Sequence, residues 1–146
     1  MTHFAEAYQK TKEYVDARIG EFTQTISARE GFFGSSAFID LLHSLQLKLT
    51  KADISLTAPL SMDAVIDSGK VYMRDMFNLY KYENLLYTME LTGEEVKDAL
   101  EYAYGLWCNR MTSDKDHLLL IKPSGDGKHY RFENPFFAFD SAAGIK

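Results

Sequence analysis

The segment that most constrains the fold is residues 84–107, "NLLYTMELTGEEVKDALEYAYGLW", where an alternating stretch runs directly into a helix signal. Alternation in 84–91 predicts a β-strand, because successive side chains of a strand point to opposite faces. Thr92 followed three residues later by Glu95 is a capping box, which predicts a helix over 92–107. The apolar face of the predicted strand carries Leu85, Tyr87, Met89 and Leu91, and the other face carries Leu86, Thr88 and Glu90.

The predicted helix has its own apolar stripe, so the strand and helix are expected to pack together. The side chains expected at this contact are Leu85, Tyr87, Val96, Leu100 and Trp107, with Ala99 and Ala103 on the same helix stripe. Packing alone does not explain Tyr82 and Asn84. These two residues lie in the loop before the strand, where side chains often point into a cleft.

The remaining chain alternates between helix and strand patterns without internal repeats or linkers. We expect an α+β fold, with helices packed on a mixed β-sheet, and a single partial domain over residues 1–146 in which 1–18 is a leading amphipathic helix. The other predicted elements are helices over 3–18, 36–48 (buried stripe Phe38, Leu41, Leu42 and Leu45) and 73–80, strands over 19–26, 53–58 and 117–122, and a hairpin turn over 124–128.

Composition narrows the class of protein. Hydrophobic residues make up 46% and the net charge is -5, which indicates a globular chain without the basic stripe of a nucleic-acid binder. Cys108 is the only cysteine, so an internal disulfide framework is excluded. No apolar run approaches the roughly 18 residues of a membrane span. The first ten residues have no apolar signal-peptide core, so we expect any export signal to lie outside this chain.

Residues with catalytic or metal-binding chemistry are scattered. His3, His43, His117 and His129 follow no metal-ligand spacing, and we expect His43 to be partly exposed or satisfied in the core. The aspartates Asp53, Asp63, Asp67 and Asp75 match no compact metal pattern, and turn or cap roles are expected for most of them. Ser35 or Ser36 is expected to cap the following helix. The residues therefore predict no catalytic residue and no metal site in this chain.

A string of motifs in the middle of the chain resembles the C-terminal domain of the 5′-nucleotidase family, which also includes UDP-sugar hydrolases and 2′,3′-cyclic phosphodiesterases. The family pattern runs from "ADI" through a glycine and an aspartate to "PFGN" and then "ELTG" opening a helix. The matching positions are Ala52-Asp53-Ile54, Gly69, Asp75, Tyr82-Glu83-Asn84 and Glu90-Leu91-Thr92-Gly93. The resemblance covers roughly residues 19–108 and extends weakly to 146.

The resemblance implies a substrate-recognition domain of a phosphoester hydrolase. In the family an N-terminal domain holds two divalent metal ions and performs the phosphate chemistry, while the C-terminal domain binds the nucleoside. By position, Tyr82 would stack on the base and Asn84 would hydrogen-bond to it. The chain itself would carry no cofactor, would bind nucleosides or nucleotides weakly in isolation, and would belong to a periplasmic, cell-surface or secreted enzyme of nucleotide catabolism.

Three departures from the family pattern leave an alternative open. The chain lacks the metal motifs of the N-terminal domain, so it is expected to be inactive alone. The family's glycine-rich turn ending in arginine reads "APLSMD" here, without an arginine, and Arg74 or Lys81 would have to compensate. The second stacking aromatic of the family has no counterpart before the end of "SAAGIK". The alternative is a stand-alone binding domain that kept the fold without enzyme activity.

The sequence of the tail adds an expectation about association. "PFFAFDSAAGIK" is apolar and resembles the approach to a further strand. We therefore expect an unpaired sheet edge and self-association, with exchange of the tail between copies as one route.

Overall fold

The computed structural model describes residues 2–59 and 61–145. They fall into two compact units, one built from residues 1–38 and 61–85 and the other from residues 39–60 and 86–146. Each unit therefore combines segments that are distant in the sequence, and each is described by itself below.

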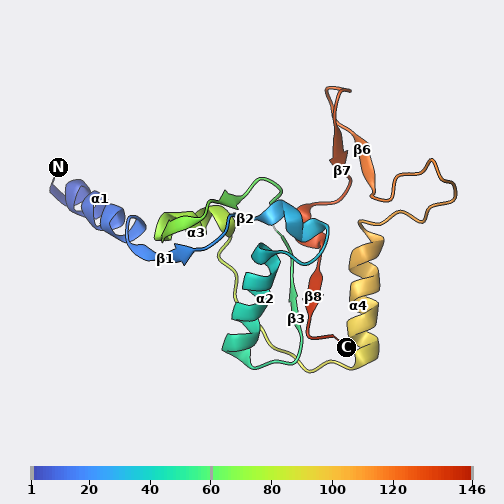
Figure 1. The fold of residues 1–146 in the computed structure, drawn as a ribbon, viewed down its shortest axis with the longest axis horizontal. Coiled ribbons are helices and arrows are strands. Elements are labelled where there is room, and N and C mark those ends of the chain that lie inside the picture. Colours follow the sequence, from blue (N-terminus) through green and yellow to red (C-terminus); the bar gives the residue numbers. More distant parts are fainter. Residues whose placement is uncertain (1, 60, 146) are drawn as a thin grey trace. The chain divides into compact units, whose positions relative to one another are not determined.

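The first unit joins helices to two short antiparallel ladders (Figure 1). Its elements are α1 (Thr2–Val15), β1 (Arg18–Phe22), β2 (Ile26–Ser27), the 3-10 turn Ala28–Phe32, β4 (Val65–Ile66), β5 (Gly69–Tyr72) and α3 (Met73–Leu79). β1 pairs with β5, and β2 pairs with β4. The core includes Ile26, Phe32, Ile66, Val71 and Leu79. Helix α1 forms as predicted, but its apolar side chains Phe4 and Tyr8 are 87% and 70% exposed.

The second unit is built around a two-stranded ladder flanked by helices. Its elements are most of α2 (Ala37–Thr50), β3 (Ser55–Thr57), α4 (Gly93–Gly105), β6 (Ile121–Pro123), β7 (Tyr130–Phe132), the 3-10 turn Phe136–Ala138 and β8 (Ser141–Ala143). β3 and β8 are antiparallel neighbours, and Figure 1 shows them between α2 and α4.

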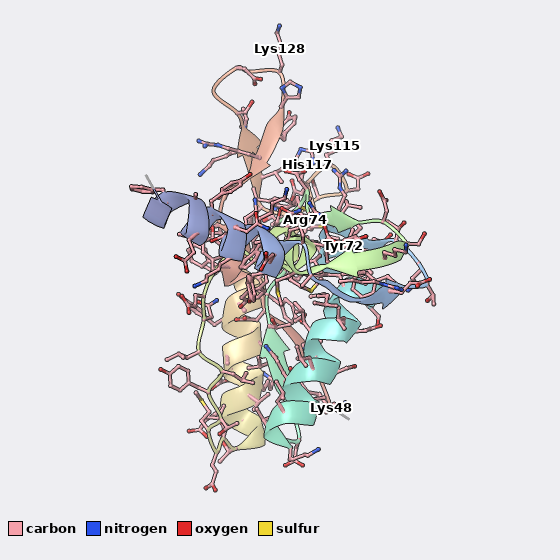
Figure 2. The ribbon with its side chains drawn as sticks, turned by 90° about the vertical axis from the view of Figure 1, so that its left-hand side faces the viewer. Lys48, Tyr72, Arg74, Lys115, His117 and Lys128 are labelled. Atoms are coloured by element: carbon pink, nitrogen blue, oxygen red, sulfur yellow. The ribbon has the colours of Figure 1, made fainter. Side chains whose placement is uncertain are left out.

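Trp107, at the end of α4, is the centre of an aromatic cluster. Its ring lies 4.7 Å from the Phe132 ring and 5.2 Å from the Phe139 ring, measured between centroids, and its side chain is 1% exposed. Asn134 fixes the same region by donating a 2.5 Å hydrogen bond to the carbonyl oxygen of Leu106. These contacts attach the β6–β7 hairpin, whose tip carries Lys128 (Figure 2), to the last turn of α4.

Gly144 follows β8 in a conformation that favours glycine, with φ of +88°. A Cβ atom at this position would approach the carbonyl oxygen of Asp53 to 2.1 Å, far inside van der Waals contact. The tail can therefore lie this close to the start of β3 only because residue 144 has no side chain.

Most predicted elements are confirmed, and the fold class is α+β. The capping box is present: Glu95 N–H donates to Thr92 Oγ1 at 3.3 Å, and Thr92 N–H donates to Glu95 Oε2 at 2.7 Å. α2 begins at Ala37, directly after Ser36, as expected for a cap at that serine. The 124–128 turn closes the β6–β7 hairpin. The predicted strand over 19–26 is divided into β1 and β2.

Three predictions about the sheet are wrong. The described strands form four separate antiparallel pairs rather than one mixed sheet. Residues 84–91 form no strand, because no neighbouring backbone in the described chain bonds to them, and Leu85 and Tyr87 are 77% and 73% exposed instead of packed on α4. The tail does not merely approach a strand, since residues 141–143 are themselves the strand β8 paired with β3.

The buried face of α2 also differs from the prediction. Phe38 is buried as expected, but Leu41 and Leu45 are 38% and 50% exposed. The helix instead buries Ile39 and His43, which lie one turn apart. The buried His43 ring contacts Ser55 and Ser141, and an apolar pattern cannot reveal such polar partners.

Candidate functional site

The residues predicted to contact a base lie on the irregular segment that follows α3 in the first unit, and this segment bends at Tyr82. Tyr80, at the end of α3, has φ of -134° and ψ of 95°, which is extended backbone. The chain bends at Tyr82, and across this bend Asn84 Nδ2 donates a 2.9 Å hydrogen bond to the Tyr80 hydroxyl. Tyr82 lies between these two residues in the sequence, and its side chain is 60% exposed.

Tyr80 is a site residue that the sequence reasoning missed. Its hydroxyl accepts a hydrogen bond from the Asn84 amide nitrogen, so the amide oxygen of this exposed residue is not used in that bond. No strand pattern in the sequence marks this contact, because the chain bends at Tyr82 between the two residues. The structure therefore brings Asn84 together with Tyr80 and leaves the Tyr82 ring accessible.

Helix α3, which precedes this segment, is anchored at its beginning. Tyr72 N–H donates to Asp75 Oδ2 at 2.7 Å, and the Arg74 guanidinium lies 5.1 Å from the Tyr72 ring centroid. Arg74 Nη1 also pairs with Asp16 Oδ1 at 3.1 Å; Figure 2 labels Arg74 beside Tyr72. These contacts pair Arg74 within the unit, while 54% of its side chain stays exposed. Lys81 is exposed.

A cavity of about 740 Å³ lies in the second unit, apart from Tyr82 and Asn84. Residues 52–56 line one side of it and residues 86–91 line another, with Gln46, Thr50 and Val96 completing the wall. The volume falls in the range of small-molecule sites. The two residues predicted to bind a base do not contribute to it.

A buried polar cluster joins α2 to both central strands of the second unit. His43 Nδ1 lies 2.9 Å from Ser55 Oγ, and His43 Nε2 lies 2.9 Å from Ser141 Oγ. Ser55 donates to Gln46 Oε1 at 2.5 Å, and Ser141 reaches the Thr57 carbonyl oxygen at 3.1 Å. The prediction of a core-satisfied His43 is confirmed. Burial lowers the pKa of His43, and the charge of Asp40 opposes this only in part.

Two surface turns hold carboxylates with lowered pKa values. Asp116 accepts hydrogen bonds from the N–H groups of Thr112 and Ser113 at 2.7 and 3.0 Å, and from their hydroxyls, which lowers its pKa to about 2. In the β6–β7 turn, Asp126 accepts from Ser124 and His129, which lowers its pKa as well. These hydrogen bonds stabilise turns, which is the role expected for short polar side chains there.

In residues 2–59 and 61–145, no group of three His, Cys, Asp or Glu side chains could hold a metal ion. No helix in the same ranges has both the length and the apolar character needed to cross a bilayer.

Comparison with known proteins relates this geometry to a family. The sequence profile of the "5'-nucleotidase, C-terminal domain" family matches residues 16–122. Among solved structures, the chain is similar to a protein described as a 5′-nucleotidase from Staphylococcus aureus, in complex with alpha-ketoglutarate, with a TM-score of 0.67 and 20% sequence identity. The similarity covers 94% of this chain and 26% of that one, so the chain spans about a quarter of that relative. A search among curated proteins found no match.

Proposed function

The chain belongs to the 5′-nucleotidase C-terminal domain family, and from this premise we propose that it recognises the nucleoside part of a nucleotide substrate through Tyr82 and Asn84. The hydrogen bond between Asn84 Nδ2 and the Tyr80 hydroxyl carries the proposal, because it fixes the amide beside an accessible ring. The base would stack on Tyr82. The Asn84 carbonyl oxygen would accept a hydrogen bond from an N–H group at the edge of the base.

The chemistry of hydrolysis would come from another part of a longer protein. An N-terminal metallophosphatase domain with two divalent metal ions would cleave the phosphate ester, and this chain would supply affinity and orientation for the nucleoside. Such a protein would act in nucleotide catabolism, and a periplasmic, cell-surface or secreted location would suit it. The tail is partly used within the chain as β8, so tail exchange is a weaker route to self-association than the sequence suggested.

Nucleoside binding is tested by titrating the chain with adenosine and uridine and following backbone amide chemical shifts. Stacking on an aromatic contributes about 1–3 kcal/mol per base, so Tyr82→Ala should weaken binding by about 5- to 150-fold. Tyr82→Phe keeps the ring and should bind within a few-fold of the natural chain. Equal affinity of the Ala and Phe variants, or shifts confined to residues far from 80–84, would contradict the proposal.

The division of labour is tested with an assay of hydrolysis. The chain is incubated with AMP or a UDP-sugar and excess Mn²⁺ or Zn²⁺, and released phosphate is compared with a blank without protein. We expect no turnover above the blank. Activity that follows the pure chain through successive chromatographic steps would place the chemistry in these 146 residues and overturn this part of the proposal.

The pairing of Arg74 with Asp16 favours a second candidate function. Without a free arginine near the base-stacking residues, the chain would act as a stand-alone binding domain that does not orient a phosphate. The two functions predict different sequences upstream of this chain in the gene. A reading frame that continues upstream through paired metal-binding motifs supports the hydrolase, whereas a frame without them supports the stand-alone binder.

A further inference from the structure

Residues 86–91 of the second unit have the sequence pattern of a strand without its hydrogen bonds. Within the part of the chain that the structure describes, none of these six residues makes a backbone hydrogen bond. Their side chains are exposed, with Tyr87 and Met89 at 73% and 72%. Backbone N–H and C=O groups of extended, alternating segments are normally paired in a ladder. The segment therefore has the character of an edge available to another strand.

The cavity of about 740 Å³ lies beside this segment. Its other wall includes Ser55 and Leu56 of β3, which among the described strands is bonded to β8 alone. Backbone with unused hydrogen-bonding capacity thus lines two sides of the same space. A strand lying in this space would be flanked by both walls, as in the addition of a strand to an exposed sheet edge.

We propose that this space receives residues 86–91 of a second copy of the chain, so that two chains form a two-fold symmetric dimer by pairing these segments antiparallel. Each segment would lie between the partner's 86–91 segment and the partner's β3. Across the interface the strands would follow in this order: β3 of one copy, residues 86–91 of the partner, residues 86–91 of the first copy, and β3 of the partner. The arrangement is closed, because each copy uses the same surface in the same way.

The sequence of the segment is self-complementary when the two-fold axis passes through Thr88. In that register Tyr87 faces Met89 of the other copy, twice, and Thr88 faces Thr88. Aromatic side chains pack well against a methionine sulfur, and Thr–Thr is a favourable cross-strand pair. Leu86 faces Glu90, so no two like charges are opposed.

Neighbouring registers are less favourable. Shifting the pairing by one residue toward Leu91 would place Tyr87 opposite Glu90 and Thr88 opposite Met89. Such a slip moves the side chains of one copy to the other face, so both Tyr87–Met89 contacts would be lost. The Thr88-centred register keeps Tyr87 and Met89 on one face and is therefore the one we expect.

Disulfide trapping tests both the dimer and its register. In a Cys108→Ser background, Thr88→Cys places two thiols opposite each other and should form a covalent dimer under mild oxidation. Its rate should exceed that of Ser113→Cys, an exposed control outside the segment, by at least about tenfold, because pairing raises the effective thiol concentration. Tyr87→Cys and Met89→Cys should each cross-link slowly alone and rapidly when mixed.

Sedimentation equilibrium provides an independent measurement that requires no thiol. Thr88→Glu would oppose two carboxylates at the axis and should shift the dimer toward monomer, whereas Thr11→Glu on α1 should leave the equilibrium unchanged. A monomer at all concentrations, with Thr88→Cys no faster than Ser113→Cys, would overturn the proposal. A monomeric Thr88→Cys/Leu56→Cys variant that closes a disulfide within one chain would also overturn it, since the segment would then pair with its own β3. Dimerisation that survives Thr88→Glu would place the contact elsewhere.

Discussion

Single polar side chains produce most of the specific geometry in this chain. Asn84 and Tyr80 are linked by their side chains across the bend at Tyr82, while His43 links a helix to two strands. The motif string predicted Asn84 and Tyr82 as contacts of a base, and this stays a prediction. It did not locate Tyr80 or the partners of His43, because Ser55 and Ser141 are 12 and 98 residues away from the histidine. Contacts at such separations leave no local pattern.

The buried His43 ring should make stability depend on pH. Its pKa in the folded chain is lowered by burial from the ordinary value of 6.5, so the unfolded chain binds a proton more readily. The free energy of unfolding should therefore fall as pH decreases below about 6.5, and continue to fall until the folded-state pKa is reached. Denaturant unfolding at several pH values between 7.5 and 5 measures this slope.

The matched variants for this measurement are His43→Gln and His117→Gln. The first removes the buried titrating group and should flatten the slope, although its overall stability should be lower because the contacts to the serines are altered. The second removes an exposed histidine outside the cluster and should keep the contribution of His43. An unchanged slope in His43→Gln would show that other groups control the pH dependence.

Helices and strands agree with the sequence prediction where the signal is local. They differ from it where the element needs a neighbouring strand to form. The helix α4 begins where the capping box predicts, and Val96, Ala103 and Trp107 are buried along its stripe. Residues 84–91 carry an equally clear alternation but form no ladder. A helix satisfies its own backbone, whereas a strand is defined by a neighbour, so only the helix could be predicted with its boundaries.

Removing the cap of α4 should destabilise the second unit. Thr92→Ala deletes the oxygen that accepts from Glu95 N–H, and loss of such a cap costs about 1 kcal/mol. It also removes the hydroxyl that, together with the Thr92 N–H, lowers the pKa of Glu95. Urea unfolding followed by circular dichroism measures the change. Thr11→Ala, in the middle of the exposed helix α1, is the control and should alter the free energy of unfolding by less than about 0.5 kcal/mol.

At the scale of the whole molecule, the sequence identified the α+β class and the family but not the division of the chain. The ordered motifs between residues 52 and 93 were sufficient for the family, which the profile match over 16–122 confirms. The two compact units could not be predicted, because each is assembled from two separate segments. The boundary between residues 85 and 86 falls inside the stretch that carries no backbone hydrogen bonds.

Limited proteolysis should cut the chain first within residues 81–91. These residues are all exposed, and backbone without hydrogen bonds adapts readily to a protease. Chymotrypsin in dilute protein should cleave after Tyr82, Tyr87 or a neighbouring leucine, and mass spectrometry of the first two fragments identifies the bond. If two copies pair through residues 86–91, cleavage in this segment should become slower as the protein concentration rises. A first cut in the exposed turn around residues 111–118 would contradict the prediction.

The position of Trp107 gives the molecule an optical signal confined to one of its units. It is the only tryptophan in the sequence, and it is enclosed by Phe132 and Phe139. Its fluorescence should be blue-shifted while the β6–β7 hairpin covers the end of α4, and should move to longer wavelength when that cover is lost. The first unit contains no tryptophan, so it does not contribute to the tryptophan fluorescence. Opening of the second unit can therefore be followed alone, by the Trp107 emission, in a mixture of partly unfolded states.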